Sequence, residues 1–194
     1  MKFSKKMELL AQALVVNTWA VEDKQVEGLL KLILKAKRVF IIGAGRSGYV
    51  GRAFAMRLMH LDFNVYVVGE PTTPAIGKGD LLIAITGSGE TESVAHVAKA
   101  AKKQGAQVGV VTSHLNSTIG KLADAPVKVG GRVAPQIEQD YFVRQIKGGY
   151  EPLAPLGTLF ELSSMVFLDT IINELMGRRG KTESELKMKH SNLE

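Results

Sequence analysis

Hydroxyl side chains and glycines alternate in the segment Thr86-Gly87-Ser88-Gly89-Glu90-Thr91. The segment follows the apolar run 81–85 and precedes residues at helical spacing, so it is predicted to join a strand to a helix. Unpaired backbone N–H groups at a helix start lie at the positive end of the helix dipole and bind anions. The hydroxyls of Thr86, Ser88 and Thr91 can donate hydrogen bonds to phosphate oxygens. The segment predicts a phosphate site, with a plain helix cap as the alternative.

A second glycine-rich turn, Gly43-Ala44-Gly45-Arg46-Ser47-Gly48, follows the apolar run 39–42. It fits the G-x-G-x-x-G pattern of dinucleotide-binding folds, so a nicotinamide or flavin enzyme is an alternative. That pattern also expects an acidic residue at the end of the second strand, and Glu70 stands late for this role. Because the turn at 86–91 repeats the phosphate-binding chemistry, a small sugar phosphate fits the pair of turns better than a dinucleotide.

Glu161 is the carboxylate whose position suits proton transfer. It lies in the first turns of a helix predicted from 157 to about 176, on the face that carries Met165, Leu168 and Ile172. The helix dipole favours a charged carboxylate there and burial favours a neutral one, so this group could act as a general base near neutral pH. An ordinary first-turn glutamate is the alternative. No spacing of His, Asp and Glu resembles a metal site, and no cofactor is expected.

The elements predicted around these residues alternate between strand and helix. One or two helices are predicted in the segment 1–36, and a tail at 177–194 holds a short helix capped by Thr182 and Glu185. Strands are predicted at 38–42, 65–68, 81–85, 108–111 and 125–129. This order favours a single α/β domain over 1–194, a five-stranded parallel sheet with helices on both faces.

Ligands bind such sheets at the carboxyl ends of the strands, which is where both glycine turns fall. His114, past the fourth strand, lies near the same edge, whereas His60 and His96 are predicted to be packing or surface residues of helices. His190 belongs to the tail. The segment 130–156 is predicted to be a long loop, and its role is left open.

The composition narrows the function classes. A chain of 194 residues with 45% hydrophobic content suits one domain with a full core, and the absence of cysteine excludes disulfides and thiol catalysis. No stretch approaches the roughly 20 apolar residues that span a bilayer, and no signal-peptide core develops, so a cytoplasmic protein with no membrane partner is expected. The net charge of +6 attracts anionic substrates. Because the basic residues are scattered, nucleic acid is not an expected partner.

Separated motifs give the chain a resemblance to a known family. They are the residues 45–48 with 55–58, 69–70 with 73–74, 86–91, 155–161 with 167–169, and 190–194. In this order they resemble the 6-phospho-3-hexuloisomerases of the sugar isomerase (SIS) domain family. The resemblance implies an α/β sandwich, usually tetrameric. It also implies that D-arabino-hex-3-ulose 6-phosphate and D-fructose 6-phosphate interconvert through a cis-enediol.

The same resemblance implies roles for individual residues. Glu161 would move the proton between the two carbons, and Arg46 would add positive charge. His190, which a neighbouring subunit donates in similar enzymes, would assist as an acid or in ring handling. The phosphate would be held by hydroxyls and nearby backbone amides of the two turns: Gly45, Ser47, Thr86, Ser88, Gly89 and Thr91.

Two departures and two rival functions remain. Leu156 stands where the family has methionine, and the stretch 132–149 is unlike the family. One rival is another SIS isomerase, such as one that acts on arabinose 5-phosphate, but those commonly carry further regulatory domains. The other is a non-catalytic sugar-phosphate sensor of the kind found in transcription regulators. Such regulators add an N-terminal helix-turn-helix, for which the segment before Arg38 is short.

Overall fold

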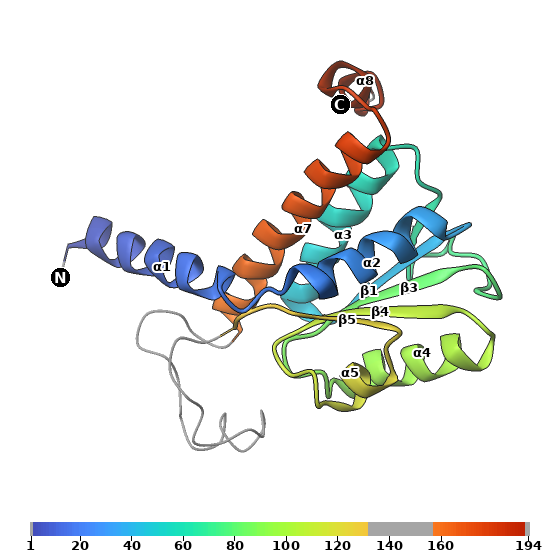
Figure 1. Cartoon of the computed structure of the whole chain (residues 1–194), viewed down its shortest axis with the longest axis horizontal. Helices are drawn as coiled ribbons and strands as arrows, with labels where there is room; N and C mark the ends of the chain where they lie inside the picture. The colour runs from blue at the N-terminus through green and yellow to red at the C-terminus, as the bar shows by residue number, and fades with distance from the viewer. Residues whose placement is uncertain (1, 132–156, 193–194) are drawn as a thin grey trace.

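Parallel strands form one sheet in the computed structural model, which describes residues 2–131 and 157–192 (Figure 1). The strands are β1 (Val39–Gly43), β2 (Val65–Val67), β3 (Leu81–Ile85), β4 (Gln107–Thr112) and β5 (Ala125–Lys128). All of the predicted strands are confirmed, with ends that shift by a residue. For example, β2 ends at Val67 because the chain turns at Gly69, where φ is 97°.

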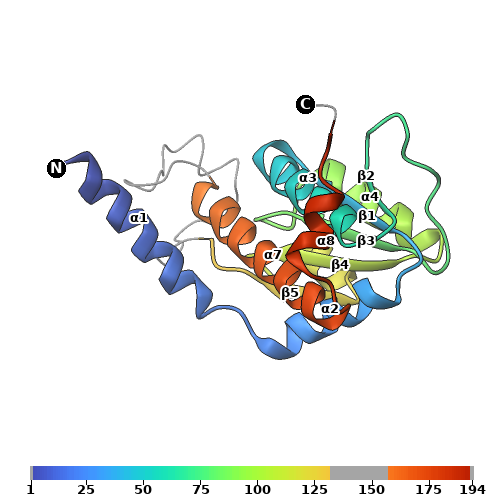
Figure 2. The ribbon, with the colours of Figure 1, turned by 90° about the horizontal axis from the view of Figure 1, so that it is seen from above.

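Helices cover both faces of the sheet, as the alternating pattern predicts (Figures 1 and 2). On one face lie α2 (Asp23–Lys35), α3 (Gly45–His60) and α7 (Thr158–Arg178), and on the other lie α4 (Glu92–Lys103) and α5 (Thr118–Leu122). Each face has its own apolar cluster, built around Phe54 and Leu58 on the first and around Val94 and Ala98 on the second.

Two further helices lie outside this sandwich. The N-terminal segment forms α1 (Phe3–Thr18), which extends away from the sheet in Figure 1. The tail forms α8 (Glu183–Met188), where Thr182 and Glu185 make the predicted capping box. The predicted loop at 130–156 lies almost wholly outside the described residues.

The strand order β2-β1-β3-β4-β5 fixes where a ligand can bind. The chain moves outward from β1 in one direction to β2 and in the other to β3, and a crevice forms at the carboxyl ends of strands where such a reversal occurs. Gly43 is in register with Ile85, and these are the last residues of β1 and β3. The turns 44–48 and 86–91 therefore start side by side.

The glycines of the first turn allow the strand and the helix to pack closely. A Cβ on Gly43 would lie 2.7 Å from the carbonyl oxygen of Ser47, and one on Gly48 would lie 2.8 Å from that of Gly43. These separations are shorter than van der Waals contact. Close packing of β1 on α3 accounts for this glycine spacing without a dinucleotide.

A buried ion pair holds the turn that leads into β3. Asp80 is 2% exposed, and its carboxylate accepts hydrogen bonds from Arg38 Nε at 3.0 Å and Nη2 at 2.7 Å, and from the backbone N–H of Gly77. The guanidinium of Arg38 holds the pKa of the Asp80 carboxyl below its usual value. Since Arg38 precedes β1, the pair joins the starts of the neighbouring strands β1 and β3.

We predict that Asp80→Asn lowers the free energy of unfolding by about 2–3 kcal/mol at pH 7, because charge-assisted hydrogen bonds are lost. A lowered pKa in the folded state stabilises it above the ordinary aspartate pKa of about 3.9, and this stabilisation disappears as the pH falls further. Urea unfolding of both proteins should therefore show a difference that shrinks below about pH 4. A difference that stays constant from pH 7 to pH 3 would contradict this role.

Candidate active site

The turn at 86–91 is held open by its own hydroxyl groups. Thr86 Oγ1 accepts a hydrogen bond from the backbone N–H of Gly89 at 3.2 Å and lies 3.3 Å from Thr91 Oγ1. Ser88 Oγ accepts from the N–H of Glu90, which leaves its own proton to donate. Since Thr86 is 3% exposed, it builds the turn from below, while Ser88 and Thr91 are partly exposed.

The end of β4 supports this turn from the other side. Thr112 Oγ1 donates to the carbonyl of Gly87, and Nδ1 of His114 lies 3.1 Å from the same oxygen. A Cβ on Gly89, whose φ is 68°, would lie 1.9 Å from Ser117 Oγ. The location predicted for His114 is confirmed. Thr112 and Ser117 were not predicted as site residues. Thr112 ends β4 and Ser117 caps α5, and their place after the fourth strand, at the ligand-binding edge, is the signal that could have identified them.

The helices that begin at this edge leave backbone donors for a ligand. Ala44 caps α3 and Thr91 caps α4, and neither makes a side-chain capping hydrogen bond. The first N–H groups of both helices therefore have no acceptor from a capping side chain. Gly45 has a φ of 55°, which brings the chain into α3, and Ser47 lies in the first turn at 9% exposure.

Glu161 lies beside both turns. Its Oε2 accepts a hydrogen bond from Nε of Arg46 at 2.5 Å, and its side chain is 13% exposed while that of Arg46 is 62% exposed. The neighbouring Phe160 packs on the second turn, where a Cβ on Gly87 would lie 3.1 Å from the ring. The start of α7 thus brings a nearly buried carboxylate to the crevice between the ends of β1 and β3.

The structure brings most of the predicted site residues together at this one edge. The first turn and the start of α3 contribute Gly45, Arg46 and Ser47, and α7 contributes Glu161. The second turn contributes the remaining members: Thr86, Ser88, Gly89 and Thr91. Their roles toward a substrate stay predictions.

His190 lies elsewhere in the same chain. Its ring stacks on that of His60, with the ring centres 5.6 Å apart, and His60 is the last residue of α3. Because Arg46 and Ser47 lie at the other end of this 16-residue helix, about 22 Å separates the two sites. The structure therefore does not bring His190 close to Glu161 of the same chain.

The tail that carries His190 is fixed by charges. Asp62, just after α3, accepts from Nζ of Lys181 at 3.0 Å and from Nζ of Lys189 at 3.1 Å. These contacts lower the pKa of Asp62. His60 is 3% exposed, and burial lowers its pKa, with further lowering by Arg57 and His190. The exposed ring of His190 is therefore held at the far end of α3 from the site.

In residues 2–131 and 157–192 no group of three or more His, Cys, Asp or Glu side chains is placed to hold a metal ion. Nor does any helix within them combine the length and apolar character needed to cross a membrane.

A family model for the SIS domain matches residues 32–132, which is more than half of the chain. The chain belongs to the SIS-domain family. The match includes every strand and both glycine turns. Glu161 and His190 lie outside the residues that the family model matches. That part of the chain is matched only by relatives that align over most of its length.

Several relatives that align over most of this SIS protein are named 3-hexulose-6-phosphate isomerase. The 3-hexulose-6-phosphate isomerase of Methylomonas aminofaciens is 40% identical over 195 residues, covering 98% of this chain and 99% of the relative. The 3-hexulose-6-phosphate isomerase of Methanocaldococcus jannaschii is 41% identical over 169 residues, covering 87% and 84%. A Methanococcus jannaschii crystal structure from which this function was inferred is 36% identical with a TM-score of 0.79, covering 98% and 99%.

We predict that Gly89→Ala weakens the binding of a sugar phosphate at least tenfold, because its Cβ would overlap Ser117 and distort the turn. Gly180→Ala is the matched control, since Gly180 has a similar φ of 61° with open space around it. Both variants should lose about 1 kcal/mol of stability from the left-handed backbone, and Gly89→Ala should lose more because of its overlap with Ser117. Calorimetric titration and urea unfolding separate the two effects, and equal binding by both variants would contradict the assignment.

Proposed function

We propose that this SIS protein is a sugar-phosphate isomerase that interconverts D-arabino-hex-3-ulose 6-phosphate and D-fructose 6-phosphate. The observation that carries the proposal is the position of Glu161, a nearly buried carboxylate between two turns built for an anion. The shared name of relatives at 38–41% identity supports the choice of substrates. A sugar phosphate held by its phosphate at the turns would present its carbon chain to Glu161.

The turns supply the phosphate contacts in this proposal. Ser88 and Thr91 are partly exposed and can donate hydroxyl protons, and the first N–H groups of α3 and α4, which no capping side chain satisfies, lie at the same strand ends. Ser47 adds a hydroxyl from the first turn of α3. Thr86 keeps the turn in shape and so acts on the phosphate through Gly89 and Thr91.

The two sugars differ in which of two adjacent carbons carries the carbonyl. From the fructose side, a base removes the proton on C3, the electron pair forms the C2=C3 bond, and the C2 carbonyl oxygen takes up a proton to give an enediol. A proton then returns to C2 while O3 loses its proton and becomes the carbonyl oxygen. We assign the carbon-to-carbon transfer to Glu161, since one carboxylate can remove a proton from one carbon and deliver a proton to the next. No cofactor or metal ion is needed for the balance of this reaction.

Arg46 holds the base in place. The short hydrogen bond from its Nε fixes one carboxylate oxygen of Glu161 and leaves the other directed toward Gly157. The mostly exposed guanidinium also places positive charge where negative charge develops on the enediolate. We therefore assign orientation of Glu161 and charge stabilisation to Arg46.

The second acid–base group comes from another subunit in this proposal. Within one chain His190 is anchored a helix length from Glu161, so it can serve only the site of a neighbouring copy. Apolar side chains along the exposed face of α3, at Tyr49, Met56 and Met59, offer a surface for such a copy. Two α3 helices packed in opposite directions would bring each His190 to the partner's site. The tetramer and the cytoplasmic location predicted from the sequence remain proposals.

We expect Glu161→Gln to reduce kcat at least 100-fold while leaving the dissociation constant of fructose 6-phosphate within about threefold, because the amide keeps the shape and loses the base. Asp169→Asn, at an exposed position on the same helix, is the control and should keep full turnover. A coupled assay and a binding titration give both numbers. Near-normal turnover of the glutamine variant would remove Glu161 from the mechanism.

Mixing inactive subunits tests the shared site. We predict that Glu161→Gln and His190→Ala proteins are each inactive, and that equal amounts unfolded and refolded together regain about a quarter of the normal activity. Only a site that combines Glu161 from the His190→Ala chain with His190 from the Glu161→Gln chain would be complete. Each variant refolded alone is the control. If the mixture stays inactive while the two chains form mixed oligomers, His190 does not act across subunits.

A further inference from the structure

Glu90 is the acidic member of the second glycine turn, and none of the proposed phosphate contacts uses its side chain. A carboxylate this close to a phosphate site would repel the phosphate if its charge faced the ligand. Both of its oxygens are engaged elsewhere: Oε1 accepts a hydrogen bond from the backbone N–H of Thr118 at 2.7 Å, and Oε2 accepts one from the Thr118 hydroxyl at 2.6 Å. The carboxylate therefore binds the first residue of α5, 28 positions further along the chain.

The start of α5 also contacts the residue before Glu90. The backbone N–H of Ile119 donates to the carbonyl of Gly89 at 3.1 Å. Ser117 fills the space where a side chain of Gly89 would lie, so it packs directly against the turn. Hydrogen bonds to a carboxylate are about twice as strong as those between neutral groups, so the two at Glu90 are the main polar link between this turn and α5.

The backbone of Glu90 lies between two partly exposed hydroxyls of the proposed phosphate site. Its N–H donates to Oγ of Ser88 at 3.2 Å, which leaves the Ser88 proton available to a ligand. On its other side Thr91 is the N-cap of α4. A Glu90 that is fixed at α5 therefore fixes the backbone that carries both hydroxyls.

We propose that Glu90 is a positioning residue of the phosphate site: by binding Thr118 it holds the turn in the form in which Ser88 and Thr91 can bind one phosphate. This inference rests on the proposed function, because it assigns the turn to the phosphate of the substrate. The contacts with Thr118 also direct the negative charge of Glu90 to α5 rather than to the ligand. The side chain itself touches neither the phosphate nor the reacting carbons.

Two substitutions of Glu90 separate its hydrogen bonds from its charge. The amide of Glu90→Gln can accept from the Thr118 N–H and donate to the Thr118 hydroxyl, so this variant keeps both contacts, whereas Glu90→Ala loses them. We expect Glu90→Ala to raise the KM and the dissociation constant of fructose 6-phosphate at least tenfold, with kcat within about threefold of the unsubstituted protein. Glu90→Gln should stay within about threefold in all of these quantities.

Thr118→Val tests the same contact from the other side. It removes the hydroxyl and keeps the backbone N–H, and Thr118 is exposed, so the substitution buries no new group. The dissociation constant should rise about threefold. The double variant Glu90→Ala/Thr118→Val should bind no more weakly than Glu90→Ala alone, because the Thr118 hydroxyl acts through the carboxylate. Additive losses would contradict the contact.

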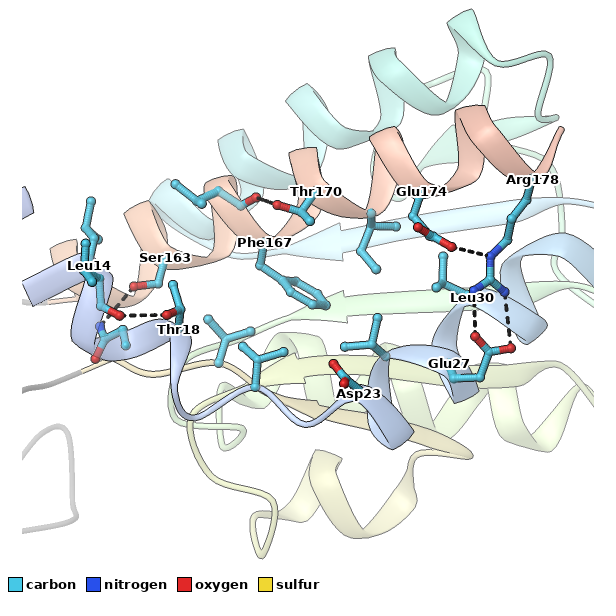
Figure 3. A pocket seen from close by; sticks show the side chains of 17 residues that line it. Leu14, Thr18, Asp23, Glu27, Leu30, Ser163, Phe167, Thr170, Glu174 and Arg178 are labelled. Carbon is cyan, nitrogen blue, oxygen red and sulfur yellow. Dashed lines mark hydrogen bonds and ion pairs between the residues drawn. The ribbon is translucent and has the colours of Figure 1, made fainter. Parts of the chain in front are cut away.

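Glu27→Ala is the matched control for lost stability. Glu27 also accepts two hydrogen bonds from a distant residue, from Nη1 of Arg178 at 3.2 Å and from Nη2 at 2.7 Å, and both side chains line a pocket between α2 and α7 (Figure 3). Arg178 is the last residue of α7, about 26 Å along the helix from Glu161. Urea unfolding should show a loss of stability in both alanine variants, while Glu27→Ala leaves the KM and the dissociation constant unchanged.

Unchanged binding by Glu90→Ala, or tighter binding after removal of its negative charge, would overturn the proposal. A large fall in kcat for Glu90→Gln would also overturn it, because Glu90 would then take part in the proton transfer. The proposed function fails separately. If the unsubstituted protein binds fructose 6-phosphate without isomerising it, and Glu90→Ala weakens that binding, the role of Glu90 at the phosphate stands and the isomerase assignment is refuted.

Discussion

The in-register pairing of β1 with β3 is the constraint on which the rest of the site depends. With Gly43 opposite Ile85, two strand-to-helix turns begin next to each other and their helices start at one crevice. The start of α7 closes that crevice, because Phe160 packs on Gly87 and Glu161 meets Arg46. A shift of one residue in the β1–β3 register would separate the anion-binding turns and turn every side chain of a strand to the other face.

Much of this arrangement could be predicted from the sequence. Strands covered on both faces are continuous apolar runs, so 81–85 is predicted to the residue, and the glycine turns follow from the strand ends. The contact of Arg46 with Glu161 joins residues 115 positions apart, and no local pattern predicts it. The same holds for Ser117 beneath Gly89 and for His190 on His60, because those contacts arise only when distant segments pack.

In the proposed enzyme, the two catalytic groups of one chain lie at opposite ends of α3 and therefore serve two different active sites. Arg46 orients the base at one end, and at the other His60 and Asp62 anchor the tail that carries His190. The proposed contact along α3 would relate two copies of the chain by a two-fold axis.

The most direct test of the central claim is the position at which solvent deuterium enters fructose 6-phosphate during incubation with the protein in D2O. Proton transfer between C2 and C3 by Glu161, with exchange of the abstracted proton for solvent deuterium, predicts deuterium at C3, detected by NMR, together with formation of the 3-ketose. Deuterium at C1 would place the chemistry on a different carbon pair. That result, or bound fructose 6-phosphate that neither exchanges nor isomerises, would contradict the account.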